Sequence, residues 1–96
     1  MNRSVRFGRL ARAEANSTQD WYELRRAGLG AEFRDALEEA IARIADSPFQ
    51  YQRVHGETRR VVLRRFPHAI YFRATEDEVV VLALVGRQDP QGWQTR

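Results

Sequence analysis

The sequence predicts an α+β fold, in which a short N-terminal strand and an antiparallel helical hairpin precede a three-stranded antiparallel meander. Residues 58–86 contain three runs rich in Val, Ile, Leu, Phe and Tyr, separated by turns at residues 66–68 and 76–78. Residues 10–44 instead carry apolar side chains at helical spacing. The chain has 96 residues, 43% of them hydrophobic, so we expect one domain over residues 1–96 with a modest core.

The first expected elements are a strand over residues 3–8 and a helix over residues 10–26. Val5 and Phe7 alternate with polar residues in the strand, which could join the meander as a fourth strand. One face of this helix is expected to carry Ala11, Ala15, Thr18 and Tyr22 at helical spacing, with Trp21 and Leu24 widening the stripe. The A-G-L-G stretch that follows is expected to end the helix in a tight connection of four residues.

The second helix is predicted by an apolar face with charged residues elsewhere, formed by Phe33, Leu37, Ala40, Ile41 and Ile44. Glu39 and Arg43 have the i,i+4 spacing that supports a helix. The helix should stop at Ser47, because the residue before a proline is pushed out of the helical region. We expect its apolar face to pack on the sheet through Val61, Leu63, Ile70 and Phe72.

Two further stretches lack a regular pattern. Residues 49–57 read as an irregular connection whose aromatic side chains pack as satellites of the core. After the last strand, Asp89 and Pro90 suit the N-cap and first position of a short C-terminal helical turn. Trp93 is expected to fold back on the sheet.

Composition limits the possible functions. The chain has no cysteine, which excludes disulfides and thiolate metal sites and makes the cytoplasm the default compartment. It has no cluster of His, Asp or Glu at metal spacing and no Gly-rich phosphate loop, so neither a metal nor a cofactor is expected. No apolar run approaches the roughly 20 residues that a membrane span needs.

The 16 basic residues are all arginine, against 13 acidic residues, for a net charge of +3. Arg60 and Arg64 alternate along one predicted strand and Tyr71 and Arg73 along the next, which can assemble a cationic surface with an aromatic among it. Alternatively, the arginine stems cover the sheet and pair with carboxylates. Two helices cover one face of a four-stranded sheet, so the other face is expected to be open unless a partner closes it.

Several motifs, taken in order, carry a family resemblance. They are W-Y-E-L-R-R-A-G-L-G-A-E-F, I-A-D-S-P-F-Q-Y, V-H-G-E-T-R-R-V-V-L-R-R-F-P-H-A-I-Y-F-R, V-V-V-L-A-L and G-R-Q-D-P-Q-G-W. From Val5 to Trp93 the chain resembles the RelE/ParE superfamily of toxins from bacterial type II toxin-antitoxin systems. The resemblance implies growth arrest, held in check by a cognate, ParD-like antitoxin in a hetero-oligomeric complex.

The superfamily has two mechanisms. RelE-type members cut messenger RNA in the ribosome. By resemblance, Arg60, Arg64 and Arg73 would stabilise the charge on the phosphate, and Tyr71 or His68 would transfer the proton. Relatives with a similar tail read H-G-R-R-D-P, whereas this chain has Val85 in place of the histidine and Gln88 in place of the second arginine. The resemblance therefore favours the ParE branch, whose members trap DNA gyrase on cleaved DNA. A plain basic nucleic-acid-binding domain is the third hypothesis.

The antitoxin is expected to bind as an acidic, amphipathic segment. Its apolar anchors would lie against the helical hairpin and the exposed sheet, near Trp21, Tyr22 and Tyr71. Its acidic residues would pair with Arg59, Arg60, Arg64, Arg73 and Arg87. His55 and His68 both fall in expected turns, where a solvated structural role is the usual one.

Overall fold

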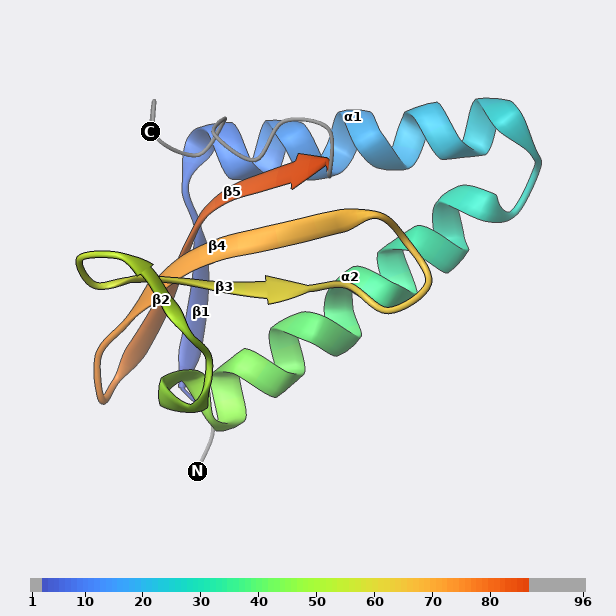
Figure 1. Cartoon of the computed structure of the whole chain (residues 1–96). Coiled ribbons are helices and arrows are strands. Elements are labelled where there is room, and N and C mark those ends of the chain that lie inside the picture. Colours follow the sequence, from blue (N-terminus) through green and yellow to red (C-terminus); the bar gives the residue numbers. More distant parts are fainter. Residues whose placement is uncertain (1–2, 87–96) are drawn as a thin grey trace.

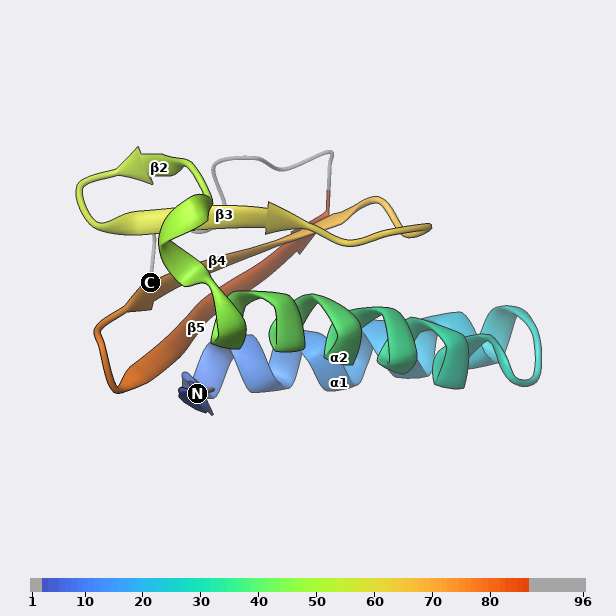
Figure 2. The ribbon, with the colours of Figure 1, turned by 90° about the horizontal axis from the view of Figure 1, so that it is seen from below.

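Residues 3–86 are described by the computed structural model, and within them one mixed sheet is covered on one face by two helices (Figures 1 and 2). The sheet order is β1-β5-β4-β3-β2. The elements are β1 (Ser4–Phe7), α1 (Arg9–Arg25), α2 (Leu29–Asp46), the 3-10 turn η1 (Pro48–Gln50), β2 (Arg53–His55), β3 (Thr58–Val62), β4 (His68–Ala74) and β5 (Glu78–Gly86). The predicted α+β fold is confirmed in part: the helical hairpin is present, and the N-terminal strand and the meander β3-β4-β5 belong to a larger, five-stranded mixed sheet. The expected C-terminal turn and Trp93 lie outside the described residues.

The sheet has one strand more than expected. β2 pairs antiparallel with β3 at one edge, inside the stretch predicted to be irregular. It was missed because it is three residues long and exposed throughout, so it has no apolar alternation to reveal it. At the other edge β1 pairs with β5 in parallel, and the remaining pairs are antiparallel.

A β-bulge in β5 changes which side chains face the helices. Tyr71 pairs with Ala83, but the next residue of β4, Phe72, pairs with Val81, so β5 has one extra residue. Val81 and Leu84 therefore both belong to the helix-facing core, although they are three positions apart. Beyond the end of β1, the Leu84 N–H has no strand beside it and donates instead to Glu14 Oε1 at 3.1 Å.

The core lies between the helices and the sheet, as predicted. Phe33, Leu37 and Ile44 of α2 are fully buried in one cluster with the expected sheet residues, and Ile41 packs at its margin. The sheet members named in advance, all in that cluster, are Val61, Leu63, Ile70 and Phe72. Ala11 and Ala15 of α1 are also buried, because small side chains let this helix approach the sheet closely.

The helical hairpin is tighter than the expected four-residue connection. α1 ends at Arg25 and α2 begins at Leu29, so Gly30 lies inside the second helix. A Cβ on Gly30 would come within 2.8 Å of the Gln19 carbonyl oxygen, which explains the glycine there. Glu23 accepts from the N–H groups of Gly28 and Gly30, both at 2.9 Å, and so satisfies the first amides of α2.

The C-terminal end of α2 and the ion pair on its surface are as predicted. The helix stops at Asp46, before Ser47 and Pro48. Arg43 Nε donates to Glu39 Oε2 at 2.8 Å, the predicted i,i+4 pair. Neither helix of the described part is long and apolar enough to cross a membrane.

Candidate functional site

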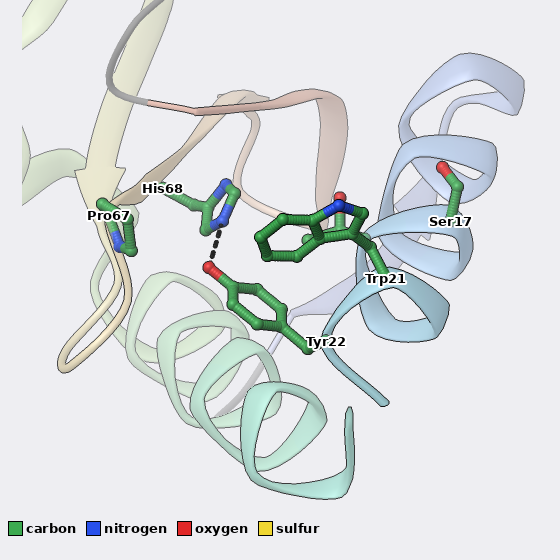
Figure 3. Close-up of a pocket in the computed structure, with 6 residues that line it drawn as sticks. Ser17, Trp21, Tyr22, Pro67 and His68 are labelled. Carbon is green, nitrogen blue, oxygen red and sulfur yellow. Dashed lines mark hydrogen bonds between the residues drawn. The ribbon is translucent and has the colours of Figure 1, made fainter. Parts of the chain in front are cut away.

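A groove of about 550 Å³ lies between α1 and the turn that leads into β4 (Figure 3). Its described lining residues are Ser17, Thr18, Trp21, Tyr22, Pro67 and His68. Successive turns of α1 supply the first four, because these positions fall on the helix side facing the start of β4. The groove therefore joins segments that are far apart in the sequence.

The floor of the groove is a hydrogen bond between Tyr22 and His68. The Tyr22 hydroxyl lies 2.9 Å from His68 Nε2, and the two rings meet edge to face at 5.8 Å (Figure 3). Burial lowers the pKa of His68 below its ordinary value, so the ring is neutral at pH 7. With its proton on Nδ1, the neutral ring accepts the hydroxyl proton at Nε2. Burial also raises the pKa of Tyr22, which keeps that hydroxyl protonated.

This arrangement corrects the expectation for His68. The residue is the first of β4 and not a solvated turn residue, and its ring stands 5.6 Å from that of the core residue Phe33. Tyr22 stacks on Phe33 at 5.4 Å and meets Phe66 at 5.0 Å. The turn before β4 bends sharply enough to bring these rings together, with Arg65 at a φ of 74°.

Trp21 forms the wall of the groove and is half exposed, at 50%. Its ring contacts Tyr22 edge to face at 5.1 Å, while the guanidinium of Arg25 lies 4.2 Å from its centroid. These two contacts hold the indole in place at the surface. A large aromatic side chain that is fixed and half exposed is typical of a binding surface.

Arg60 lies beside the groove. It lines a smaller depression together with Val62, Pro67, His68 and Ala69, and Pro67 and His68 border both hollows. The Arg60 side chain is exposed and, within residues 3–86, its guanidinium has no hydrogen bond or ion pair. It is the arginine of the described sheet that remains available for a ligand.

The arginines expected beside Arg60 are engaged elsewhere. Arg59 lies on the other face of β3, opposite Phe72, and donates to the carbonyl oxygens of Tyr51 at 2.6 Å and Phe49 at 3.3 Å. Arg73 donates from Nε to Thr58 Oγ1 at 3.2 Å. Both side chains hold the fold together at the β2 end of the sheet.

Arg64 does not share a face with Arg60, contrary to prediction. β3 ends at Val62, and in the turn Arg64 reaches Glu39 of α2 at 3.4 Å. The neighbouring Arg65 pairs with Glu32 at 2.8 Å. That hydrogen bond from Arg65, aided by one from Arg26, lowers the pKa of the Glu32 carboxyl.

Tyr71 is buried, at 4% exposure, so the open sheet face expected around it is wrong at its centre. It lies between Arg60 of β3 and Ala83 of β5 and clusters with Ala69, Ala83 and Val85. Of the residues expected to bind the antitoxin, Trp21 and Tyr22 line the groove, and Arg60 lines the neighbouring hollow. Arg87 lies outside the described residues.

Sequence reasoning missed the parts of the groove that depend on folding. Ser17, Thr18 and Pro67 carry no chemical signal of their own, and Tyr22 and His68 are 46 positions apart. The available signal in the sequence was the adjacent pair Trp21 and Tyr22, the aromatic residues of α1. Within residues 3–86, no group of three His, Asp or Glu side chains could hold a metal ion.

Comparison with known families matches this chain to the ParE toxin of the type II toxin-antitoxin system parDE. The match covers residues 5–90, which places the chain among the toxins of type II toxin-antitoxin systems. Within that class, the chain belongs to the ParE toxin family.

A solved structure described as the chromosomal ParDE TA system from P. aeruginosa has a similar fold, with a TM-score of 0.76. The two sequences are 18% identical, and the alignment covers 88% of this chain and 95% of that chain. A likeness at this identity shows a shared fold. Among curated proteins, no match was found.

Proposed function

We propose that this toxin arrests bacterial growth by poisoning DNA gyrase in the cytoplasm. Membership of the ParE family supports the proposal. The observation that carries it is the state of the candidate ribonuclease residues: Arg64 pairs with Glu39 of α2, Arg73 donates from Nε to Thr58, and Tyr71, beside Arg60, is buried. RNA cleavage needs cations and a proton-transfer group that face one phosphate and one ribose hydroxyl together, and neither the buried Tyr71 nor the engaged Arg64 is placed to do so.

A cognate, ParD-like antitoxin is proposed to neutralise the toxin in a hetero-oligomer. The half-exposed Trp21 and Arg60, whose side chain has no ion pair within residues 3–86, support a partner that offers both an apolar and an acidic contact. The P. aeruginosa structure is itself described as a ParDE system. An antitoxin that covers this region would block access of the toxin to its target.

Cleavage of messenger RNA on the ribosome is the second candidate function. One observation favours it: His68 and Arg60 line the same depression, so a group able to transfer a proton lies near a cation able to hold a phosphate. The lowered pKa of His68 leaves it neutral, as a general base must be. Its ring nitrogen is occupied by Tyr22, however, and would have to be released to act.

The deciding experiment adds the purified chain to DNA gyrase, supercoiled plasmid and ATP. A gyrase poison converts the plasmid to linear DNA after denaturation of the enzyme, and prior addition of the antitoxin prevents this. Parallel reactions contain ribosomes programmed with messenger RNA. Linear DNA with intact RNA supports gyrase poisoning, whereas cut RNA that depends on Arg60 and His68 assigns the second function.

The third hypothesis, a plain nucleic-acid-binding domain, is tested in the same preparation. It predicts binding of duplex DNA or RNA without gyrase or ribosomes, with an affinity that falls steeply as salt rises. Such binding in the absence of any effect on gyrase or ribosomes would replace the toxin mechanism proposed here.

A further inference from the structure

Three large apolar side chains lie exposed along α1, the helix at the margin of the molecule (Figure 1). They are Leu10 at 52% exposure, Trp21 at 50% and Leu24 at 88%. The helix packs into the core through Ala11 and Ala15, so its opposite side faces away from the rest of the described chain. Apolar groups exposed together along one helix gain free energy when a partner covers them.

The outward side of α1 has the spacing of a helix-packing surface. Leu10, Ser17 and Leu24 follow one another at intervals of seven residues, which places them on one line along the helix. Ala13 and Ser17, in the middle of this line, are small and exposed, so another helix can approach closely there. Together with the exposed edge of Trp21, these residues form what we refer to as the outer seam of α1.

The outer seam is complementary to itself when a second copy of the helix runs antiparallel. A two-fold axis through Ser17 brings Leu10 of one copy against Leu24 of the other, because both are equally far from position 17. The same axis brings the small Ala13 opposite the large Trp21. Leucine therefore meets leucine at both ends, and a small side chain meets a large one between them.

The charges beside the seam favour the antiparallel direction. Arg9 and Asp20 flank it on the same side, since α1 turns by about 100° per residue. Within residues 3–86, neither side chain has a hydrogen bond or an ion pair. In a parallel pair, like charges would lie opposite each other. In the antiparallel pair, Arg9 of each copy lies about 7.5 Å along the axis from Asp20 of the other, a span that an arginine side chain can bridge.

We propose that the chain self-associates as a two-fold dimer through the outer seam of α1. The occupant of this surface is a second copy, so the inference goes beyond the proposed function and does not depend on it. The contact is confined to one helix of each copy, about 25 Å long, so a Kd of about 10 to 100 µM is expected. Trp21 is also a wall of the groove, so a second copy and a molecule seated in the groove compete for it.

Sedimentation equilibrium of the purified full chain, from about 1 to about 300 µM, brackets that Kd. Leu24→Asp should raise it by about tenfold or more, because the contact would have to desolvate a carboxylate. The matched control is Val62→Asp, which changes an apolar side chain that is 41% exposed on the sheet, outside the seam. It should stay within about twofold of the unaltered chain. Thermal unfolding confirms that each variant is folded.

Charge reversal tests the direction of the helices. Arg9→Asp and Asp20→Arg each place like charges near each other across the antiparallel pair, so each should weaken association by about threefold or more. The double variant that carries both changes should associate like the unaltered chain, because the opposite charges meet again. A parallel pair would give no such recovery, since its single variants would lose nothing.

The two-fold axis is tested with single cysteines, because the chain has none of its own. Ser17→Cys places two thiols opposite each other at the axis and should give a covalent dimer on mild oxidation. Ala13→Cys places its two thiols about 12 Å apart along the helices and should remain largely monomeric. Ala31→Cys, exposed on α2, is the control for chance collisions.

Three results would overturn the proposal. In one, the chain stays monomeric over the whole concentration range, and Leu24→Asp instead loses binding to the protein encoded beside its gene, which assigns the seam to that partner. In another, the chain dimerises and Leu24→Asp associates as well as Val62→Asp, which places the contact elsewhere. In the third, Ala13→Cys and Ala31→Cys form covalent dimers as fast as Ser17→Cys, which excludes an axis at Ser17.

Discussion

Arg59 and Arg60 are neighbours on β3, yet the fold uses them for opposite purposes. Arg59 points to the helix-facing side, where it donates to two backbone carbonyl oxygens, and its guanidinium lies 5.2 Å from the Phe49 ring. The Arg3 guanidinium lies 5.3 Å from the same ring. Arg60 points to the other side and stays free of such contacts within residues 3–86. Strand alternation alone separates an arginine that ties backbone segments together from one whose side chain is left to the solvent.

His68 makes folding stability depend on pH. Its pKa is lowered in the folded state by burial and returns to about 6.5 in the unfolded chain. Between those two values the unfolded state holds more protons, so acid favours unfolding. The free energy of unfolding should therefore be level above pH 6.5 and decrease as the pH falls below it, by at most about 1.4 kcal/mol per pH unit. Urea denaturation from pH 8 to pH 5 measures this.

The variant His68→Gln should lose the decrease between pH 6.5 and pH 5, while the control His55→Gln, exposed at the end of β2, should keep it. Glu32 contributes in a separate range, because its lowered pKa adds stability that is lost only as the pH falls below about 4.5. An unchanged slope in His68→Gln would show that this histidine is not buried in solution.

At the scale of elements, α2 anchors the sheet through its apolar face. Leu37→Ala removes a fully buried side chain from the cluster and should lower the free energy of unfolding by about 2 to 5 kcal/mol. Leu24→Ala, on the exposed side of α1, should change it by less than about 0.5 kcal/mol. Chemical denaturation of both variants checks this, and similar values for the two would mean that the buried face of α2 is assigned wrongly.

Gly30 tests the close contact between the two helices. In most helix interiors, Gly→Ala adds about 1 kcal/mol of stability. Here the new Cβ would meet the Gln19 carbonyl oxygen at 2.8 Å, so Gly30→Ala should destabilise by about 1 to 3 kcal/mol. Ala31→Gly, at the next and exposed position, should show the ordinary loss of about 1 kcal/mol. A gain of stability in Gly30→Ala would show that the helices are further apart.

Local sequence patterns predicted the helices and strands better than they predicted the contacts between them. The 3.6-residue period located the core face of α2, because burial of that face dictates which residues occupy it. The bulge in β5 was not predictable, because it is a shift in the pairing between two strands. The strand β2 was not predictable, because its three residues are all exposed and show no apolar alternation. Gly30 was assigned to the loop because its reason for being glycine is a contact with Gln19, on the other helix.

At the scale of the whole molecule, the candidate site was predicted only in part. Trp21 and Tyr22 were identified because aromatic residues are visible in the sequence, and their groove was not, because Pro67 and His68 come from a distant turn. The cationic surface was overestimated. Alternation on β3 puts Arg59 on the opposite face from Arg60, where it donates to the Tyr51 carbonyl. An ion pair with Glu39, which the sequence does not reveal, removes Arg64.

The toxin class makes one prediction for the chain as a whole. Induced expression of the full chain in a bacterial host should stop growth, and gyrase poisoning should produce double-strand breaks and a DNA-damage response while bulk messenger RNA stays intact. Co-expression of the adjacent partner should restore growth, since the proposed complex would cover the region around Trp21 and Arg60. Colony counts and pulsed-field electrophoresis of the chromosome provide the measurement.

Two controls make that result interpretable. Leu37→Ala lowers stability without changing a residue of the groove, so it shows how much toxicity is lost through unfolding alone. A surface variant that loses toxicity while it remains as stable as the unaltered chain has lost a contact with the target instead. Arg60→Glu leaves the core intact and should weaken rescue by the antitoxin, so cells that express both proteins should again stop growing provided that the variant remains toxic. Normal growth with confirmed soluble expression of the unaltered chain would contradict a toxin, whatever the antitoxin does.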